Sequence, residues 1–230
     1  TTEVRNSTFM NNNNYAITGS NQRPSLYNCR ISNNERGIRY VGTVQNCIIN
    51  NTASDWAIES AGEILNTTVV SNANGISGGS SISNSIVYFN SDTQVSSSGN
   101  VNYSNIQGGY DGTGNIELNP AFYDYYDFEL HDTSPCIDAG SPDPSYYDLC
   151  FPPSQGTSIN DMGAYGGPDA CGWSENPTGG IVVTPASLDF ETLMINTSDS
   201  LQLTIVPELL IEKDYLFTIV PSGEDSISSS

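Results

Sequence analysis

The sequence predicts an all-β chain built around a parallel β-helix, a solenoid of stacked coils. A motif of asparagine, a small residue, any residue and an apolar residue begins at Asn6, Asn28, Asn46, Asn66 and Asn84. A sixth copy begins at Tyr103 with the asparagine lost. Successive copies are 22, 18, 20, 18 and 19 residues apart, a spacing typical of solenoids.

Further apolar positions divide each period into three short strands. One set precedes the motif by two residues: Val4, Leu26, Val44, Ile64, Ile82 and Val101. A second set follows it by ten to twelve residues: Ile17, Ile38, Ile58, Ile76 and Val95. Helical repeats need longer amphipathic runs and leucine-rich repeats need leucine columns, so we expect three strands per coil. Equivalent strands of neighbouring coils then lie about 4.8 Å apart, and like positions stack into columns.

The motif itself predicts which side chains face the core. We expect Leu26, Cys29 and Ile31 to point inward and Asn28 to form a corner. Asparagine tolerates the left-handed backbone conformation there, and its amide can bond its neighbours in the stack. Cys29 and Cys47 would be inward neighbours that pack as structural thiols. Two cysteines without His or further Cys nearby supply too few ligands for a metal.

Charge is distributed unevenly along the 230 residues. The net charge is −20, of which residues 1–110 carry −1 and the remainder −19. Such a surface argues against nucleic-acid binding and repels anionic membranes. No signal peptide or long apolar segment is visible, so we expect no membrane insertion and interpret the chain as a fragment of a secreted protein. The acids either attract divalent cations or only keep the protein soluble.

The periodicity ends near Gly109, where aromatic and turn-forming residues take over. The open end of a solenoid must be covered, so we expect this second segment to form a lid. The predicted organisation is coils in 1–110, an irregular disulfide-bonded cap in 111–176, a linker in 177–180, a β module in 181–222 and a disordered tail in 223–230.

The cap segment contains three specific motifs: NPAFYD from Asn119, SPCIDAG from Ser134 and NDMGAYGG from Asn160. With the coils, they resemble the C-terminal end of right-handed parallel β-helix proteins of the pectin-lyase-like superfamily, in a secreted bacterial group. Ile159 stands where similar proteins carry Arg, so any ion pair from that Arg is absent. The resemblance implies an extracellular or bacterial cell-surface location. It also implies extracellular polysaccharide or cell-surface components as partners.

In an exported chain, the cysteines of the cap gain a role. A bridge between Cys150 and Cys171 would close a loop of about twenty residues and stabilise the lid by roughly 3 kcal/mol. Cys136 is then the odd cysteine, which we expect to be buried in the cap.

No cofactor is required by the sequence, although the cap offers oxygen ligands for calcium. The candidate ligands are Asp124, Asp127, Asp138, Asp148 and Asp161. No EF-hand or nonapeptide calcium repeat is present. The alternative is that acids such as Asp138 and Asp161 cap turns by accepting backbone N–H bonds.

An active site would be expected on an outward column of the coils. The column that follows the second apolar set contains Thr18, Arg39, Glu59, Ser77 and Ser96. Glycoside hydrolysis needs two carboxylates, and this column offers one. Arg39 beside Glu59 is the nearest approach to the base of a polyuronate lyase, but a surface ion pair explains both with less assumption. His131 has no matching nucleophile and acid, so we expect a turn residue beside Asp132.

Tyrosines give the remaining functional hint. Their rings could stack on sugars, or pack inward against the solenoid end. The candidates are Tyr123, Tyr125, Tyr126, Tyr146 and Tyr147.

The C-terminal module begins with TPASLDF, which resembles the start of Ig-like modules of bacterial surface proteins. Leu201, Leu203 and Ile205 alternate as in a half-buried antiparallel strand. Only about four strands fit, which indicates a partial Ig-like module.

Two functional hypotheses follow. The first is a non-catalytic extracellular structural or adhesive module that could bind carbohydrate. The alternative is the C-terminal portion of a polysaccharide lyase or glycoside hydrolase whose catalytic coils lie upstream. An uncovered N-terminal coil would also permit end-to-end self-association.

Overall fold

A computed structural model of the chain describes residues 2–174, 181–184 and 204–207. The chain divides into two units, Thr1–Asn176 and Pro177–Ser230. In the second unit, β16 (Ile181–Thr184) pairs antiparallel with β17 (Thr204–Pro207), and Ile205 lies opposite Val183. Leu201, Leu203, the linker and the expected tail fall outside the described residues.

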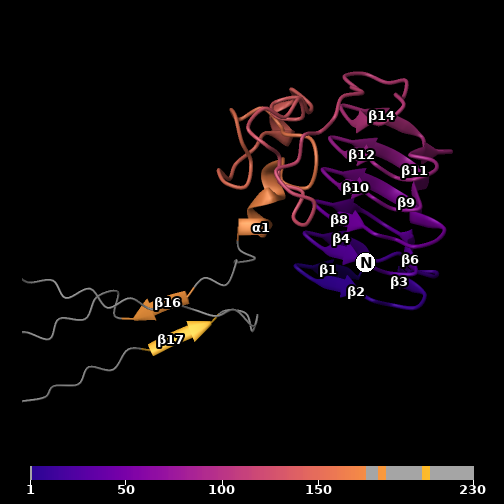
Figure 1. The fold of residues 1–230 in the computed structure, drawn as a ribbon, viewed down its shortest axis with the longest axis horizontal. Coiled ribbons are helices and arrows are strands. Elements are labelled where there is room, and N and C mark those ends of the chain that lie inside the picture. The colour runs from indigo at the N-terminus through magenta and orange to yellow at the C-terminus, as the bar shows by residue number, and fades with distance from the viewer. Residues whose placement is uncertain (1, 175–180, 185–203, 208–230) are drawn as a thin grey trace, which may run out of the picture. The chain divides into compact units, whose positions relative to one another are not determined.

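The first unit is a parallel β-solenoid of about five turns, which confirms the predicted fold class (Figure 1). The first coils contain β1 (Glu3–Arg5), β2 (Thr8–Met10), β3 (Tyr15–Thr18), β4 (Ser25–Tyr27), β5 (Arg30–Ser32) and β6 (Arg36–Val41). The next contain β7 (Val44–Gln45), β8 (Ile48–Asn50), β9 (Trp56–Leu65), β10 (Thr68–Val70) and β11 (Asn74–Ser83). The last contain β12 (Ile86–Tyr88), β13 (Val95–Ser96), β14 (Asn100–Asn102) and β15 (Asn105–Ile106).

The strand register stacks the apolar sets as the sequence predicts. Parallel pairing aligns Val4, Leu26, Val44, Ile64, Ile82 and Val101 in one column. It aligns Ile17, Ile38, Ile58, Ile76 and Val95 in another. A third column continues the motif itself: Phe9, Ile31, Ile49, Val69, Val87 and Ile106. These columns supply most of one continuous apolar core.

Hydrogen bonding joins the strands into two large sheets rather than three. Nine strands form one sheet and six form the other. The nine-stranded sheet contains two of the three expected strands of each coil, because β9 and β11 run through the corner between them. That corner is a bend at residues with positive φ, which are Tyr40, Ser60, Gly78 and Ser97.

The motif asparagines form the first corner with the predicted backbone conformation. Their φ values are 47° for Asn6, 50° for Asn28, 49° for Asn46, 42° for Asn66 and 51° for Asn84. Tyr103, which replaces the sixth asparagine, keeps φ at 48°.

The expected bonding of these asparagines to one another is wrong. Asn28, Asn46 and Asn66 instead donate their amides to the cap. A stack of amides does occur, just after the second corner of the coil. There the Asn72 amide donates to Asn90 Oδ1 at 2.9 Å, and Asn90 donates to Gln94 Oε1 at 2.7 Å.

Cys29 and Cys47 are buried inward neighbours with free thiols, as expected. Each thiol donates to the carbonyl two residues earlier, at 3.2 Å. Thr67 and Ser85 occupy the same column and make the same bond at 2.9 and 2.8 Å. The two cysteines therefore take a place that small hydroxyl residues fill in other coils.

The segment after Gly109 covers the last coil, as expected, and also a second surface that was not expected. Only its first part continues the coils, since Ile116 forms a parallel bridge with Asn105. The rest runs back along the outer face of the six-stranded sheet (Figure 1). There Ile48, Val70 and Ile86 pack in a second core against cap residues including Phe128, Leu130, Cys136, Met162 and Tyr165. The physical reason is that these strands are apolar on both faces, so their outward side chains also need cover.

The cap contains little regular structure. It has two short 3-10 helices, Pro144–Tyr146 and Pro168–Ala170, and the one-turn helix α1 (Cys171–Ser174). A disulfide joins Cys150 and Cys171, with Cα atoms 5.3 Å apart. Cys136 is free and fully buried, as predicted.

Candidate functional site

The outward column of the nine-stranded sheet brings the two candidate catalytic residues together. Thr18, Arg39, Glu59, Ser77 and Ser96 are in register, as predicted. Arg39 Nε lies 3.2 Å from Glu59 Oε2 in a half-buried ion pair. The Arg39 guanidinium also lies over the Tyr40 ring, 4.4 Å from its centroid.

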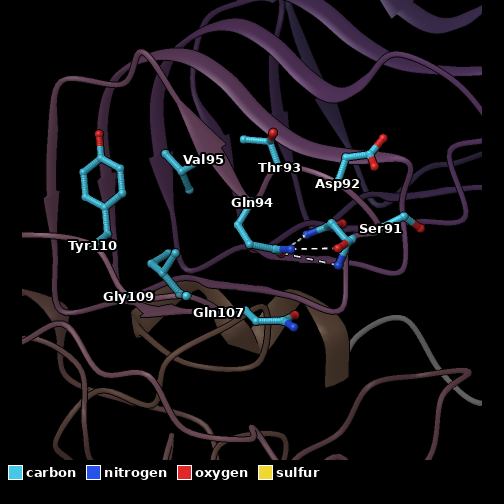
Figure 2. Close-up of a pocket in the computed structure, with 11 residues that line it drawn as sticks. Ser91, Asp92, Thr93, Gln94, Val95, Gln107, Gly109 and Tyr110 are labelled. Atoms are coloured by element: carbon cyan, nitrogen blue, oxygen red, sulfur yellow. Dashed lines mark hydrogen bonds between the residues drawn. The ribbon is translucent and has the colours of Figure 1, made fainter.

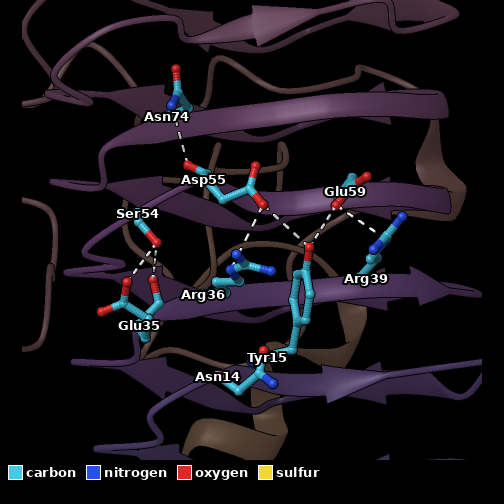
Figure 3. A network of polar contacts seen from close by, with 9 residues as sticks. All are labelled: Asn14, Tyr15, Glu35, Arg36, Arg39, Ser54, Asp55, Glu59 and Asn74. Atoms are coloured by element: carbon cyan, nitrogen blue, oxygen red, sulfur yellow. Dashed lines mark hydrogen bonds and ion pairs between the residues drawn. The ribbon is translucent and has the colours of Figure 1, made fainter.

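A larger network surrounds this pair (Figure 3). The Tyr15 hydroxyl lies 3.0 Å from Glu59 Oε2 and 3.2 Å from Asp55 Oδ2, so its proton is shared between two carboxylates. Arg36 Nε lies 4.0 Å from the same Asp55 oxygen. Burial, followed by the hydrogen bond to Glu59 and the charges of both acids, raises the pKa of Tyr15.

Sequence reasoning missed the second carboxylate of this network. Asp55 lies at a corner with φ of 61°, outside the column that contains Glu59. The available signal was the register of Tyr15 with Arg36, which places that ring beside the acids of the next coil. Both carboxylates are already occupied by an arginine and by the tyrosine hydroxyl. The network therefore consists of two carboxylates, two guanidinium groups and one phenol that bond to one another.

The cap acids accept backbone N–H bonds. Asp124 Oδ1 accepts from the N–H groups of Tyr126 and Asp127, both at 2.8 Å. Asp127 pairs with Arg30 at 2.9 Å. Asp138 accepts from the Thr157 N–H at 2.9 Å.

Asp148 and Asp161 are the most deeply buried acids of the cap. Asp161 accepts from the N–H groups of Asp138 at 2.8 Å and Gln155 at 2.7 Å. Asp148 accepts from the N–H groups of Asp161 at 3.1 Å and Gly167. Burial is the main cause that raises the pKa of Asp148 to about 7 and of Asp161 to about 6.

The structure does not gather the candidate calcium ligands into one cage. Asp124 and Asp127 share one turn, whereas Asp138 and Asp161 meet in another part of the cap. Within the described residues, no group of three or more His, Cys, Asp or Glu side chains is arranged to hold a metal ion.

Residues 121–131 form a loop, the tyrosine loop, whose ends pair. Phe122 and Leu130 form an antiparallel bridge, and the Tyr123 N–H donates to the Glu129 carbonyl at 2.7 Å. Phe122 and Phe128 turn into the second core, with ring centroids 5.4 Å apart. These contacts fix the loop to the coils.

The tyrosines of this loop point outward. Tyr123, Tyr125 and Tyr126 are 74, 69 and 75% exposed. The expectation that some of them pack inward is wrong, because Phe122 and Phe128 take the inward positions. Tyr125 contacts the edge of Phe89, and Arg30 lies 5.6 Å from the centre of the Tyr126 ring.

The remaining candidates are less accessible or isolated. Tyr146 and Tyr147 are half-buried at and after the first 3-10 helix. His131 is exposed beside Asp132, as expected, with Nδ1 2.7 Å from the carboxylate. Its ring stacks on Tyr123 at a centroid distance of 6.2 Å.

A scan against protein-family models finds no match, and neither a search of curated proteins nor a search of solved structures finds one. Within the described part of the chain, no helix is both long and apolar enough to cross a membrane.

Proposed function

We propose that the chain is a non-catalytic structural or adhesive module of a larger secreted or cell-surface protein, and that the tyrosine loop contacts carbohydrate. The observation that carries this proposal is the exposure of three tyrosine rings on a loop anchored at both ends. Aromatic rings with a polar tip suit sugars, whose C–H faces are apolar and whose rims are polar.

The anchoring of the loop supports binding rather than mere exposure. Its inward phenylalanines are held by the second core, and Arg30 contacts both the Asp127 carboxylate and the Tyr126 carbonyl, at 2.9 and 2.7 Å. A surface ordered before binding loses less conformational entropy when a ligand arrives.

The polar network of Tyr15 supports a non-catalytic role. Its carboxylates and guanidinium groups neutralise one another in a compact surface cluster. A hydrolase or lyase needs an acid or base that can exchange a proton with substrate.

The disulfide of the cap is compatible with an exported chain. The resemblance of the coils and cap motifs supports the further proposal of a secreted or bacterial surface protein of the pectin-lyase-like kind, with residues 181–222 as an Ig-like spacer. Calcium would be an optional ligand of the cap rather than a requirement.

The test is retention of the purified chain on immobilised cellulose, xylan, mannan and pectin. On the polysaccharide that retains the unaltered chain, the double variant Tyr125→Ala/Tyr126→Ala should bind with about tenfold lower affinity. Tyr40→Ala is the matched control, because it removes an exposed ring from the coils instead. Equal retention of both variants would contradict the proposed role of the loop.

A separate assay tests the absence of catalysis. The chain is incubated with pectin, polygalacturonate and alginate, with and without calcium, and the ultraviolet absorbance of unsaturated uronates is followed. We expect a flat trace. A rise that disappears in Arg39→Ala would establish a lyase and overturn the non-catalytic reading.

A further inference from the structure

The last coil contains a hollow of about 430 Å³ between the loop that precedes β13 and the segment that follows β15 (Figure 2). Tyr110 and Val95 lie at one side of the view, and Ser91 and Asp92 lie at the other. Its volume falls in the usual range of small-ligand pockets, about 300–1,000 Å³.

The polar wall of the hollow is held in place by the preceding coil. The N–H groups of Ser91 and Asp92 donate to the carbonyls of Asn72 and Ala73, at 2.9 and 3.0 Å. The Gln94 amide folds back on Asn90 and donates to its carbonyl at 2.7 Å. The backbone that presents the outward side chains is therefore ordered without a ligand.

Four polar groups of the lining have unused hydrogen-bonding capacity. The side chains of Ser91, Asp92 and Thr93 make no hydrogen bond to the described residues, and neither does Gln107 Nε2. Gln107 is nevertheless oriented, because its Oε1 accepts from the Phe89 N–H at 2.7 Å. The wall thus combines hydroxyl groups with a planar amide and a planar carboxylate, which can accept and donate to neighbouring hydroxyls of a ligand.

Part of the lining is apolar. Val95 and Tyr110 are half-buried and pack against the main core of the coils. The Tyr110 ring is therefore fixed by the core while it also lines the hollow. Polar side chains and an aromatic ring therefore line the same hollow, a combination that suits a sugar, which has an apolar C–H face and a hydroxyl rim.

The charge of the lining selects among sugars. The hollow is lined by one acid, Asp92, and by no lysine, arginine or histidine. Uronates, sulfates and phosphates would meet a negative charge without a cation to offset it. A neutral sugar avoids this cost and gains a charge-assisted hydrogen bond to Asp92.

From these features we infer a second carbohydrate site at this hollow, one that takes neutral sugars. Ser91, Asp92, Thr93 and Gln107 bind the hydroxyl groups, and Tyr110 stacks on the ring. The inference rests on the proposed function only in taking carbohydrate as the class of partner. It uses residues of the last coil and none of the tyrosine loop.

The test is titration of the full chain with cellotetraose, xylotetraose and mannotetraose, and with tetragalacturonate as the acidic comparison. Isothermal calorimetry measures affinity, and amide chemical shifts in NMR locate the site. At least one neutral probe should saturate and shift the amides of residues 91–95 and 107–110. Asp92→Asn should weaken its binding about fivefold and Tyr110→Ala about tenfold.

Two controls keep this result specific. Asp111→Asn removes one negative charge, as Asp92→Asn does, but from a nearby residue outside the hollow. The affinity of this variant for the neutral oligosaccharide should stay within about twofold of that of the unaltered chain. Tyr110→Phe keeps the ring and the core contact, so it should bind nearly normally even if Tyr110→Ala loses stability.

Three outcomes would overturn the site. They are binding that survives both Asp92→Asn and Tyr110→Ala, tighter binding of tetragalacturonate than of every neutral probe, or no saturation by any neutral probe up to about 10 mM. In those cases the proposed function would still be supported if retention of the chain on polysaccharide depends on Tyr125 and Tyr126. Conversely, the retention test could fail while the neutral oligosaccharides still bind in the titrations. That result would contradict the carbohydrate role of the tyrosine loop and leave the site at the hollow supported.

Discussion

The asparagine at the first corner of each coil acts through both its backbone and its amide. Its left-handed backbone turns the chain between two sheets, which costs other residues roughly 1–2 kcal/mol. In the middle coils its amide also reaches the cap. Asn66 Nδ2 donates to Asn160 Oδ1 at 3.1 Å and to the Asp161 carbonyl at 3.0 Å, in a buried setting.

Replacing Asn66 should separate these two contributions. We expect Asn66→Ala to lower the free energy of unfolding by about 3 kcal/mol, because it adds backbone strain and leaves buried acceptors without a donor. Asn11→Ala is the matched control, since Asn11 has φ of 59° but is exposed and makes no side-chain bond. It should cost only about 1 kcal/mol. Urea denaturation measures both, and equal losses would show that the amide contacts contribute nothing.

The buried acids of the cap have raised pKa values, whereas an ion pair usually lowers the pKa of a carboxyl group. Asp148 has its pKa raised from 3.8 to about 7, chiefly by burial, with further contributions from the charges of Asp161 and Asp138. The folded chain therefore binds this proton more tightly than the unfolded chain does. By linkage, the free energy of unfolding falls as pH rises from about 4 to about 7.

This sign gives a pH prediction. The free energy of unfolding, measured by urea denaturation, should be about 2 kcal/mol lower at pH 8 than at pH 5 because the buried acids lose their protons in this range. Asp148→Asn should flatten that slope, whatever its effect on absolute stability. Asp143→Asn should leave the slope unchanged, because the pKa of Asp143 is lowered by its bonds to Ser145 and it is ionised throughout this range. A slope that is equal in all three proteins would contradict the assignment.

At the scale of elements, consecutive apolar residues decide which strands the cap covers. In β8, Ile48 points outward and Ile49 inward, and both are fully buried. In β5, the outward position belongs to Arg30, which reaches the cap by an ion pair instead. An Ile–Ile pair in a strand is therefore the sequence signal of a second packed layer.

The disulfide ties two segments of that layer together. Cys150→Ser should lower the free energy of unfolding by about 3 kcal/mol, because the bridge closes a loop across 21 residues of sequence. Cys47→Ser is the control: Ser85 and Ser104 fill the same inward column, so it should change stability by less than about 1 kcal/mol. Thermal and urea unfolding without reductant provide the measurement. An unchanged Cys150→Ser protein would show that the bridge does not stabilise the cap.

At the scale of the whole molecule, the coils could be predicted from the sequence almost residue by residue. Three apolar columns and the first corner follow from a period near twenty residues, because stacking in register repeats each local environment. The outward column of Arg39 and Glu59 was predictable for the same reason. In the cap, the Cys150–Cys171 bridge and the burial of Cys136 were predictable, but the path of the chain was not, because the cap has no repeat and its contacts join segments about one hundred residues apart.

The parallel solenoid, the inward cysteines and the left-handed asparagine corners could be predicted from the sequence, since each depends on interactions between one coil and the next. Three features emerge only in the folded chain: the cap lies along the six-stranded sheet, Asp55 joins Tyr15 and Glu59, and the loop tyrosines face outward. The folded chain also reveals the hollow between Asp92 and Tyr110. These features depend on how non-repeating segments meet in space, and burial of apolar surface selects that meeting without leaving a periodic signal.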